Sequence, residues 1–276
     1  MIRALRSEWY RLWRPGMVLG GIGTMAAVAA LAALLVFANA QPPTAQATPP
    51  SGPPAGGPGD RGGGLPTTVA LAAPQGMVSV FTFFSGILGV ISLVLFAQTT
   101  GAEYRDGTLK MLLSREPRRL AVLAGKLVAI SAFVGIAILA AFVAQTATAS
   151  IVSAARGLST SAWWTADGWQ NAAGVVARAW IACLVRGLLG AMMAILFRSA
   201  APAIGVGIGY LLVGEGLIFL VWRDATKWLP NFVLGTFTAG GSSTQSLAEV
   251  SLLLAAYAAG FLLVAGATFW RRDVTG

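Results

Sequence analysis

Six long apolar runs dominate this 276-residue sequence. A helix needs about 20 predominantly apolar residues to cross the hydrocarbon core of a bilayer. Only 11% of the residues are charged, whereas a soluble domain carries about 25%. Such a chain cannot cover its surface with polar groups, so the sequence predicts an all-α integral membrane protein with six transmembrane helices in one domain, residues 1–276. The predicted spans are residues 17–38, 77–97, 120–152, 173–197, 201–222 and 247–269.

The N-terminal residues 1–16 predict an amphipathic helix that lies in the plane of the lipid headgroups. At 100° per residue, Trp9 and Trp13 share the apolar face and four arginines gather on the opposite face. A basic flank that only orients the first span is the alternative. Ala38-Asn39-Ala40 has the form of a signal-peptidase site, but the apolar run before it exceeds the about 7–15 residues of a signal peptide. A retained first span is therefore favoured.

Two further segments do not fit a simple succession of spans. Residues 39–76 hold nine of the 13 prolines and only two charged residues. Such a segment buries too little apolar surface to offset its ordering entropy, which predicts a disordered Pro/Gly-rich external loop. Residues 229–239 are apolar but too few to cross alone. They predict a re-entrant or interfacial element before the last span.

The distribution of basic residues predicts the orientation. With a cytoplasmic N-terminus, 13 Lys and Arg residues lie on the cytoplasmic side and four on the other. Cytoplasmic segments carry such an excess. Both termini and residues 98–119 are therefore expected in the cytoplasm of a multi-pass plasma-membrane protein that contacts membrane lipid. Because the basic residues lie at the ends of apolar runs, the net charge of +9 does not indicate a nucleic-acid partner.

Several kinds of chemistry are missing from the sequence. The chain has no His, and Cys183 is its one Cys. This excludes His-based catalysis, an intrachain disulfide and a Cys/His metal site. There is no G-x-x-x-x-G-K-[ST] motif for binding ATP. We therefore expect no enzyme activity, no catalytic residues, no metal and no cofactor, so that any energy for transport comes from another protein.

Three charged residues lie deep within predicted spans, far from the span ends: Arg178, Arg186 and Glu215. A charge at the bilayer centre costs about 2.5–3.5 kcal/mol on insertion scales. Counting about 1.5 Å per helical residue places Glu215 between the two arginines in depth. We hypothesise that Glu215 pairs with Arg178 or Arg186, either to fix helix register or to line a translocation path. In span five, Gly205 and Gly209 also have the G-x-x-x-G spacing of closely packed membrane helices.

Residues 98–119 form the one long charged interruption between strongly apolar runs. Gly101 is expected to end span two, with a short polar turn after it. Thr108 is expected to cap a short helix whose leucines form an apolar side and whose Lys110 and Arg115 stay in water. An exposed short helix with an apolar patch suits docking into a groove of another protein. A helix resting on the membrane surface is the alternative.

With these features, the chain resembles the ABC-2-type transporter permeases, which are the transmembrane subunits of ABC exporters. The N-terminal helix, the six spans and the short element before the last span are similar. So is the sequence pattern Glu103, Gly107-Thr108-Leu109, Leu112-Leu113, Pro117, Arg119 and Gly125-Lys126-Leu127, with the ending Arg271-Arg272-Asp273. The resemblance implies that residues 98–119 are a cytoplasmic coupling loop that docks on a separate ATP-binding subunit. The implied contact residues are Glu103, Gly107, Thr108, Leu109, Leu112 and Leu113.

The resemblance also implies an assembly of two permeases, either identical or homologous, with two ATPases. The expected activity is efflux of a hydrophobic or amphipathic small molecule or peptide. An ion-coupled secondary transporter that uses Glu215 and a non-transporting membrane scaffold remain as alternatives. The long segment 39–76 is not a feature of the family core, so its role stays open.

Overall fold

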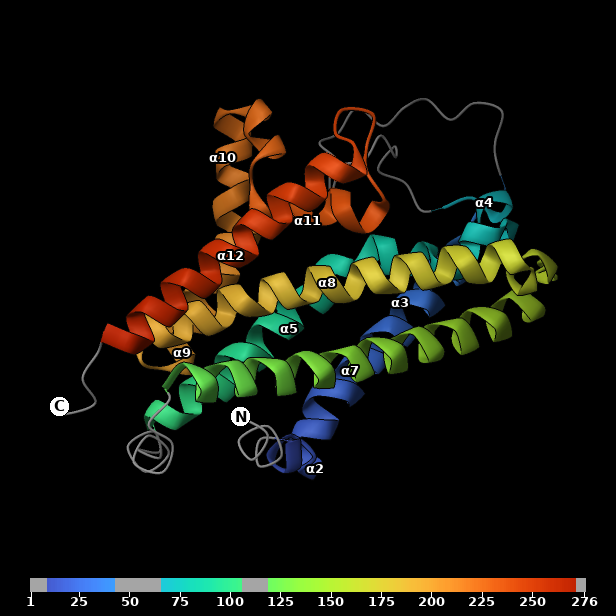
Figure 1. Ribbon diagram of the computed structural model, residues 1–276. Coiled ribbons are helices and arrows are strands. Elements are labelled where there is room, and N and C mark those ends of the chain that lie inside the picture. The colour runs from blue at the N-terminus through green and yellow to red at the C-terminus, as the bar shows by residue number, and fades with distance from the viewer. Residues whose placement is uncertain (1–8, 43–65, 106–118, 272–276) are drawn as a thin grey trace.

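The computed structural model describes residues 9–42, 66–105 and 119–271 (Figure 1). Every regular element in these ranges is helical. The first part contains α2 (Pro15–Met17), the π-helix η1 (Val18–Gly23), α3 (Thr24–Asn39), α4 (Thr68–Ala72), η2 (Pro74–Val78), α5 (Ser79–Arg105) and α7 (Arg119–Ala155). The second part contains η3 (Ser161–Trp164), α8 (Ala166–Phe197), α9 (Ala200–Gly209), the π-helix η4 (Tyr210–Gly214), α10 (Glu215–Val221), η5 (Arg223–Lys227), α11 (Pro230–Ala239) and α12 (Leu247–Arg271).

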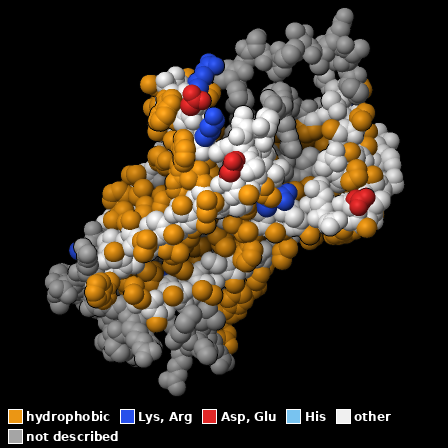
Figure 2. All heavy atoms as spheres, turned by 45° about the horizontal axis from the view of Figure 1, so that its top comes forward, with side chains coloured by type: hydrophobic (Ala, Val, Ile, Leu, Met, Phe, Trp, Pro, Cys, Tyr) orange, Lys and Arg blue, Asp and Glu red, His pale blue; other side chains and the backbone are white. Residues whose placement is uncertain are grey.

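Six helical segments in the described ranges are long and apolar enough to cross a membrane. They are Pro15–Asn39, Pro74–Ala102, Leu120–Ala155, Ala166–Phe197, Ala200–Val221 and Leu247–Trp270. The prediction of an all-α protein with six membrane-length helices is thereby confirmed. Figure 2 shows hydrophobic side chains over much of the visible face, with few charged ones among them. This is the surface expected of helices that meet lipid.

The packed centre of the protein is a bundle of α3, α5, α7 and α8 (Figure 1). The contacts of α5 with α8 are the most extensive, and small residues permit the close approach. Ser92 Oγ donates to the carbonyl of Cys183 at 2.7 Å. A Cβ on Gly187 would collide with the ring of Phe96, which is fully buried. Small residues serve the same purpose at membrane helix interfaces generally.

At one end of the bundle, which we call the α2 end, the structure corrects the sequence prediction for Gly101. The residue does not end span two, because α5 continues through it to Arg105. A Cβ on Gly101 would lie 2.5 Å from the backbone nitrogen of Ala200. The glycine is therefore needed where the start of α9 crosses α5. A lysine near the end of a span often extends toward the headgroups, but Lys126 in the early turns of α7 is only 4% exposed.

The crowding at Gly101 gives a testable prediction. Gly101→Ala is expected to lower the free energy of unfolding by about 1–3 kcal/mol, because the backbone of α9 must shift to admit the methyl group. Gly205→Ala is the matched control, since the position of its Cβ has no neighbour within 4 Å. That variant should change stability by less than about 1 kcal/mol. Thermal unfolding in detergent compares the two, and equal effects would contradict the assigned role of Gly101.

The opposite end, the α4 end, is closed by α4, η2 and η3. The indole of Trp163 is fully buried, and its Nε1–H donates to the carbonyl of Leu71 at 2.9 Å. Gln145 Nε2 donates to the carbonyl of Met77 at 2.7 Å. Residues 68–76 are thus helical, and the prediction of a disordered loop is wrong for this part of 39–76. Apolar side chains there find a buried site that the low-complexity composition did not indicate. Residues 43–65 lie outside the described ranges.

Arg156 connects the α4 end to the first span. Its guanidinium donates to the carbonyls of Phe37 and Ala40, the latter at 2.9 Å. These carbonyls belong to the C-terminus of α3, where a cation also interacts favourably with the helix dipole. Ala40 is only 1% exposed, and α3 packs along α7. The first apolar run thus packs as a helix of the bundle.

Candidate functional site

A buried polar centre lies between span four, span five and the short helix α11. Span four contributes Arg186 and span five contributes Glu215, which are 2% and 1% exposed. The third member is Asn231 in the first turn of α11. All three lie among apolar helices, where an unpaired charge is costly. Their contacts therefore decide what the two charged residues can do.

Glu215 binds the N-terminus of α11. Its two carboxylate oxygens accept from the backbone nitrogen of Asn231 at 2.9 and 3.0 Å. The backbone of Phe232 and the side chain of Tyr210 lie next to the same carboxylate. The first amides of a helix have no partner within the helix, and the helix dipole favours an anion at this end. Glu215 thus supplies from another span the acceptor that α11 needs.

Arg186 reaches the same helix through a side chain. Its Nη2 donates to Oδ1 of Asn231 at 2.8 Å. Nε and Nη1 are buried and have no hydrogen-bond partner among the residues that the structure describes. They lie against α5 at Gly89, where a Cβ would come within 2.9 Å of both nitrogens. The absence of a side chain at Gly89 is what admits the guanidinium between α5 and α8.

The hypothesis of a direct pair between Glu215 and an arginine is wrong. Within the described ranges no ion pair within 4.0 Å joins Glu215 to Arg178 or Arg186. Asn231 lies between Arg186 and Glu215 and bridges them. Its side-chain oxygen accepts from the guanidinium, and its backbone N–H donates to the carboxylate. The sequence could have indicated this role, because Asn231 is the one amide side chain in the apolar run 229–239.

Arg178 meets the other end of α11. Its Nε donates to the carbonyl of Thr238 at 3.4 Å, and the residue is half-buried. Gly240 ends the helix with a φ of 91°, a conformation suited to glycine. Because Arg186 binds the first turn of α11 and Arg178 the last, α11 runs antiparallel to α8. An anion at its N-terminus and a cation at its C-terminus both match the helix dipole.

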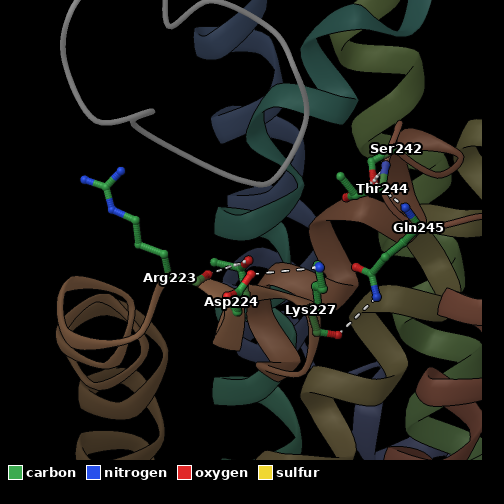
Figure 3. A network of polar contacts seen from close by, with 7 residues as sticks. Arg223, Asp224, Lys227, Ser242, Thr244 and Gln245 are labelled. Carbon is green, nitrogen blue, oxygen red and sulfur yellow. Dashed lines mark hydrogen bonds and ion pairs between the residues drawn. The ribbon is translucent and has the colours of Figure 1, made fainter.

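The loops beside α11 carry a more exposed set of polar contacts (Figure 3). Gln245 Nε2 donates to the carbonyl of Lys227 at 3.1 Å, and Lys227 Nζ lies 3.9 Å from Asp224. Figure 3 shows Arg223 pointing away from this group. Exposed ion pairs contribute about 0–1 kcal/mol. The contacts connect η5 with residues 240–246. In the described ranges, no group of three or more His, Cys, Asp or Glu is placed to hold a metal ion.

One of the residues expected to dock an ATPase lies in a described helix, at the α2 end. Glu103 lies in the last turns of α5, whereas Gly107, Thr108, Leu109, Leu112 and Leu113 lie outside the described ranges. A cavity of about 510 Å³ opens beside the end of α5. Its lining comes from the N-terminal helix, α5 and α9, and includes Arg11, Leu12, Gln98, Thr99, Ser199 and Ile204. Three segments far apart in the sequence therefore meet where α5 leads into residues 106–118.

Comparisons with known proteins identify a family without assigning an activity. No curated protein matches the chain. A family described as "Protein of unknown function (DUF2705)" matches residues 63–275. The matched region includes five of the six membrane-length helices, α11 and the whole polar centre. The chain therefore belongs to the DUF2705 family of proteins of unknown function.

Proposed function

We propose that this protein is the membrane-spanning permease subunit of an ABC-2-type ABC transporter. A separate ATP-binding subunit would drive export of a hydrophobic or amphipathic small molecule or peptide. The observation that carries the proposal is the meeting of the N-terminal helix, the end of α5 and the start of α9 around one cavity. An ATPase bound there would contact the segments that lead directly into three of the spans.

Such an arrangement suits the transmission of a conformational change. The ATPase would bind residues 98–119 differently in its two nucleotide states and so shift the population of permease conformations. Gly101 brings α5 against Ala200, so a displacement of the coupling loop would reach both span two and span five. Glu103 and the segment 107–113 would form the docking surface in this proposal.

The proposed orientation places the α2 end in the cytoplasm of a plasma-membrane protein. Arg14 and Arg198 are exposed at this end. Exposed tryptophans, which favour the membrane–water boundary, occur toward both ends of the spans, as Trp13 and Trp222 illustrate. The excess of basic residues in the segments assigned to the cytoplasm supports both termini inside.

A second permease copy completes the proposed transporter. Many side chains of the span-five segment and of α12 are exposed in the single chain, including Leu220 at 73% and Leu252 at 75%. Gly205 and Gly209 also leave open space beside α9. Lipid and a second copy, identical or homologous, would share these faces. We propose no nucleic-acid partner.

Purification of the tagged chain from its native membrane tests the proposal. A nucleotide-binding ATPase is expected to co-purify, and the reconstituted complex should hydrolyse ATP faster when a hydrophobic peptide or drug mixture is added. Complexes formed with a Walker-lysine variant of that ATPase provide the control without hydrolysis. If no nucleotide-binding protein co-purifies with the chain from membranes in which the ATPase is expressed, the proposal is overturned.

The buried carboxylate favours one second candidate, an ion-coupled secondary transporter. A titratable residue inside the membrane is a frequent element of proton and ion pathways. Both carboxylate oxygens of Glu215, however, already accept from the backbone amide of Asn231, which indicates that Glu215 has a structural role at the N-terminus of α11. Uptake into vesicles distinguishes the candidates, since transport with an imposed ion gradient and no ATPase would favour the second. Loss of transport in a correctly inserted Leu112 variant would argue against a scaffold.

A further inference from the structure

The outer half of span five stands apart from the bundle (Figure 1). Among the described residues, α10 makes its extensive contacts only with η4 and η5, its neighbours in sequence. Its apolar side chains face outward, as Leu217 at 57%, Leu220 at 73% and Val221 at 91% exposure show. The inner half is different, because Ala203 is fully buried and Gly207 packs against Leu93. In span five, the inner half is thus packed against other helices, whereas the outer half has few contacts outside its own segment.

The boundary between the two halves is the π-helix η4, Tyr210–Gly214. A π-segment interrupts the regular i→i−4 ladder and is frequent at functional sites. Gly209 and Gly216 flank it, and a Cβ on either would have no neighbour within 4 Å. Packing within the chain therefore does not require these glycines, although each lowers helix stability by about 1 kcal/mol relative to alanine. Both features make this place in the span easier to bend.

Beyond η4, polar contacts hold the outer half to α11. Both oxygens of the Glu215 carboxylate accept from the backbone amide of Asn231. The ring of Phe219 lies against that of Phe232, with centroids 5.9 Å apart. Asn231 adds a bond from Nδ2 to the carbonyl of Leu211 at 3.4 Å, inside η4 itself. Because hydrocarbon offers no replacement partners, these polar contacts are costly to break in the bilayer.

We propose that η4 is a hinge in span five and that the Glu215 carboxylate, bound to the amide of Asn231, is the latch that fixes α10 against α11. With the latch closed, α10 keeps one position relative to α12. With the latch open, α10 and η5 rotate about η4 while α9 stays anchored on α5 and α8. Arg186 and Arg178 hold α11 on α8 throughout, so the moving part is the outer half of span five.

Distances between spin labels test the latch in the full chain in lipid nanodiscs. Labels at Leu220 and Leu252 report α10 against α12, and both residues are exposed. Labels at Leu31 and Leu139 report α3 against α7 as the reference pair, since these helices pack together. All variants carry Cys183→Ala, because Cys183 is the one native cysteine. In the protein with an unaltered Glu215, each pair of labels should give one narrow distribution of distances.

Glu215→Gln is expected to at least double the width of the Leu220–Leu252 distribution and to leave the reference pair unchanged. The glutamine keeps the size of the side chain but replaces one acceptor oxygen with an NH2 group that faces backbone donors. Glu249→Gln is the matched control, because Glu249 lies in the exposed first turn of α12 and accepts from Ser246. It should change neither distribution.

Asn231→Ala provides a second variant in case Glu215→Gln does not fold. It removes the side-chain bonds to Leu211 and Arg186 but leaves the backbone donor to Glu215. In Asn231→Ala, the Leu220–Leu252 distance distribution is expected to be wider than in the protein with the unaltered latch and narrower than in Glu215→Gln. An unchanged Leu220–Leu252 distribution in the folded variants, or an equal broadening of the reference pair, would overturn the proposal. Since the measurement needs no ATPase, its outcome is independent of the proposed transport function.

Discussion

Replacing Leu112 by glutamate is expected to lower the amount of co-purified ATPase at least about 10-fold. Leu112 belongs to the apolar side of the helix predicted for residues 108–114. A charge introduced there would be buried without a partner at the proposed interface. Central interface residues commonly contribute about 2 kcal/mol or more, and about 1.4 kcal/mol corresponds to a tenfold change in affinity. Quantitative immunoblotting of the purified complex measures the ratio of the two subunits.

The matched control is Lys110→Gln, on the side of the same helix predicted to face water. This variant should retain most of the ATPase, because a rim charge contributes little to binding free energy. The amount of chain in the membrane fraction shows whether each variant inserts. If Leu112→Glu inserts normally and keeps its full share of ATPase, the apolar side of this helix is not the docking surface. Equal losses in both variants would also contradict the assignment.

Truncating either charged member of the polar centre is expected to destabilise the protein by about 3–5 kcal/mol, as removal of one partner from a buried charged pair does elsewhere. Arg186→Met leaves the buried Glu215 charge without its nearby cation and leaves Asn231 Oδ1 without its donor. Glu215→Leu leaves the α11 amides without an acceptor. Thermal unfolding of the purified chain in one detergent, followed by circular dichroism, measures both effects.

Arg178→Met is the control for the loss of an arginine as such. Arg178 is only half-buried, and it contacts one carbonyl at the C-terminus of α11. Its removal should cost no more than about 2 kcal/mol. In the double variant Arg186→Met with Glu215→Leu, the loss should be smaller than the sum of the single losses, because Asn231 couples the two residues. Strict additivity would show that the bridge through Asn231 has no energetic role.

The number and type of the membrane-length helices could be predicted from the sequence, and four of the six agree with the structure within about three residues at each end, whereas span two continues to Ala102 and span four begins at Ala166. Span four ends at Phe197, where Arg198 adopts a left-handed conformation with a φ of 54°. The short apolar run before the last span forms the helix α11. These features depend on local composition, because the length and polarity of each run decide how it can satisfy its backbone in lipid.

Glycine and tryptophan were harder to interpret from the sequence. Gly101 suggested a helix end, but in the structure it lies where two helices cross. Trp163 is a fully buried donor to the carbonyl of Leu71, a role that its place in the sequence does not indicate. Glycine and tryptophan each occur in several structural roles, and the role at a given position depends on which residues pack against it in the folded protein. The same applies to residues 68–76, whose helices depend on the site that Trp163 and Gln145 provide.

From the sequence alone it follows that this chain has six helices long and apolar enough to cross a membrane, and that Arg178, Arg186 and Glu215 need partners within them. Each conclusion follows from the cost of placing a given residue in hydrocarbon, which depends on that residue and its near neighbours. The identity of the partners follows only from the packing of the helices. Asn231 lies 45 residues from Arg186 and 16 from Glu215, and its position between them depends on how α8, span five and α11 pack against one another.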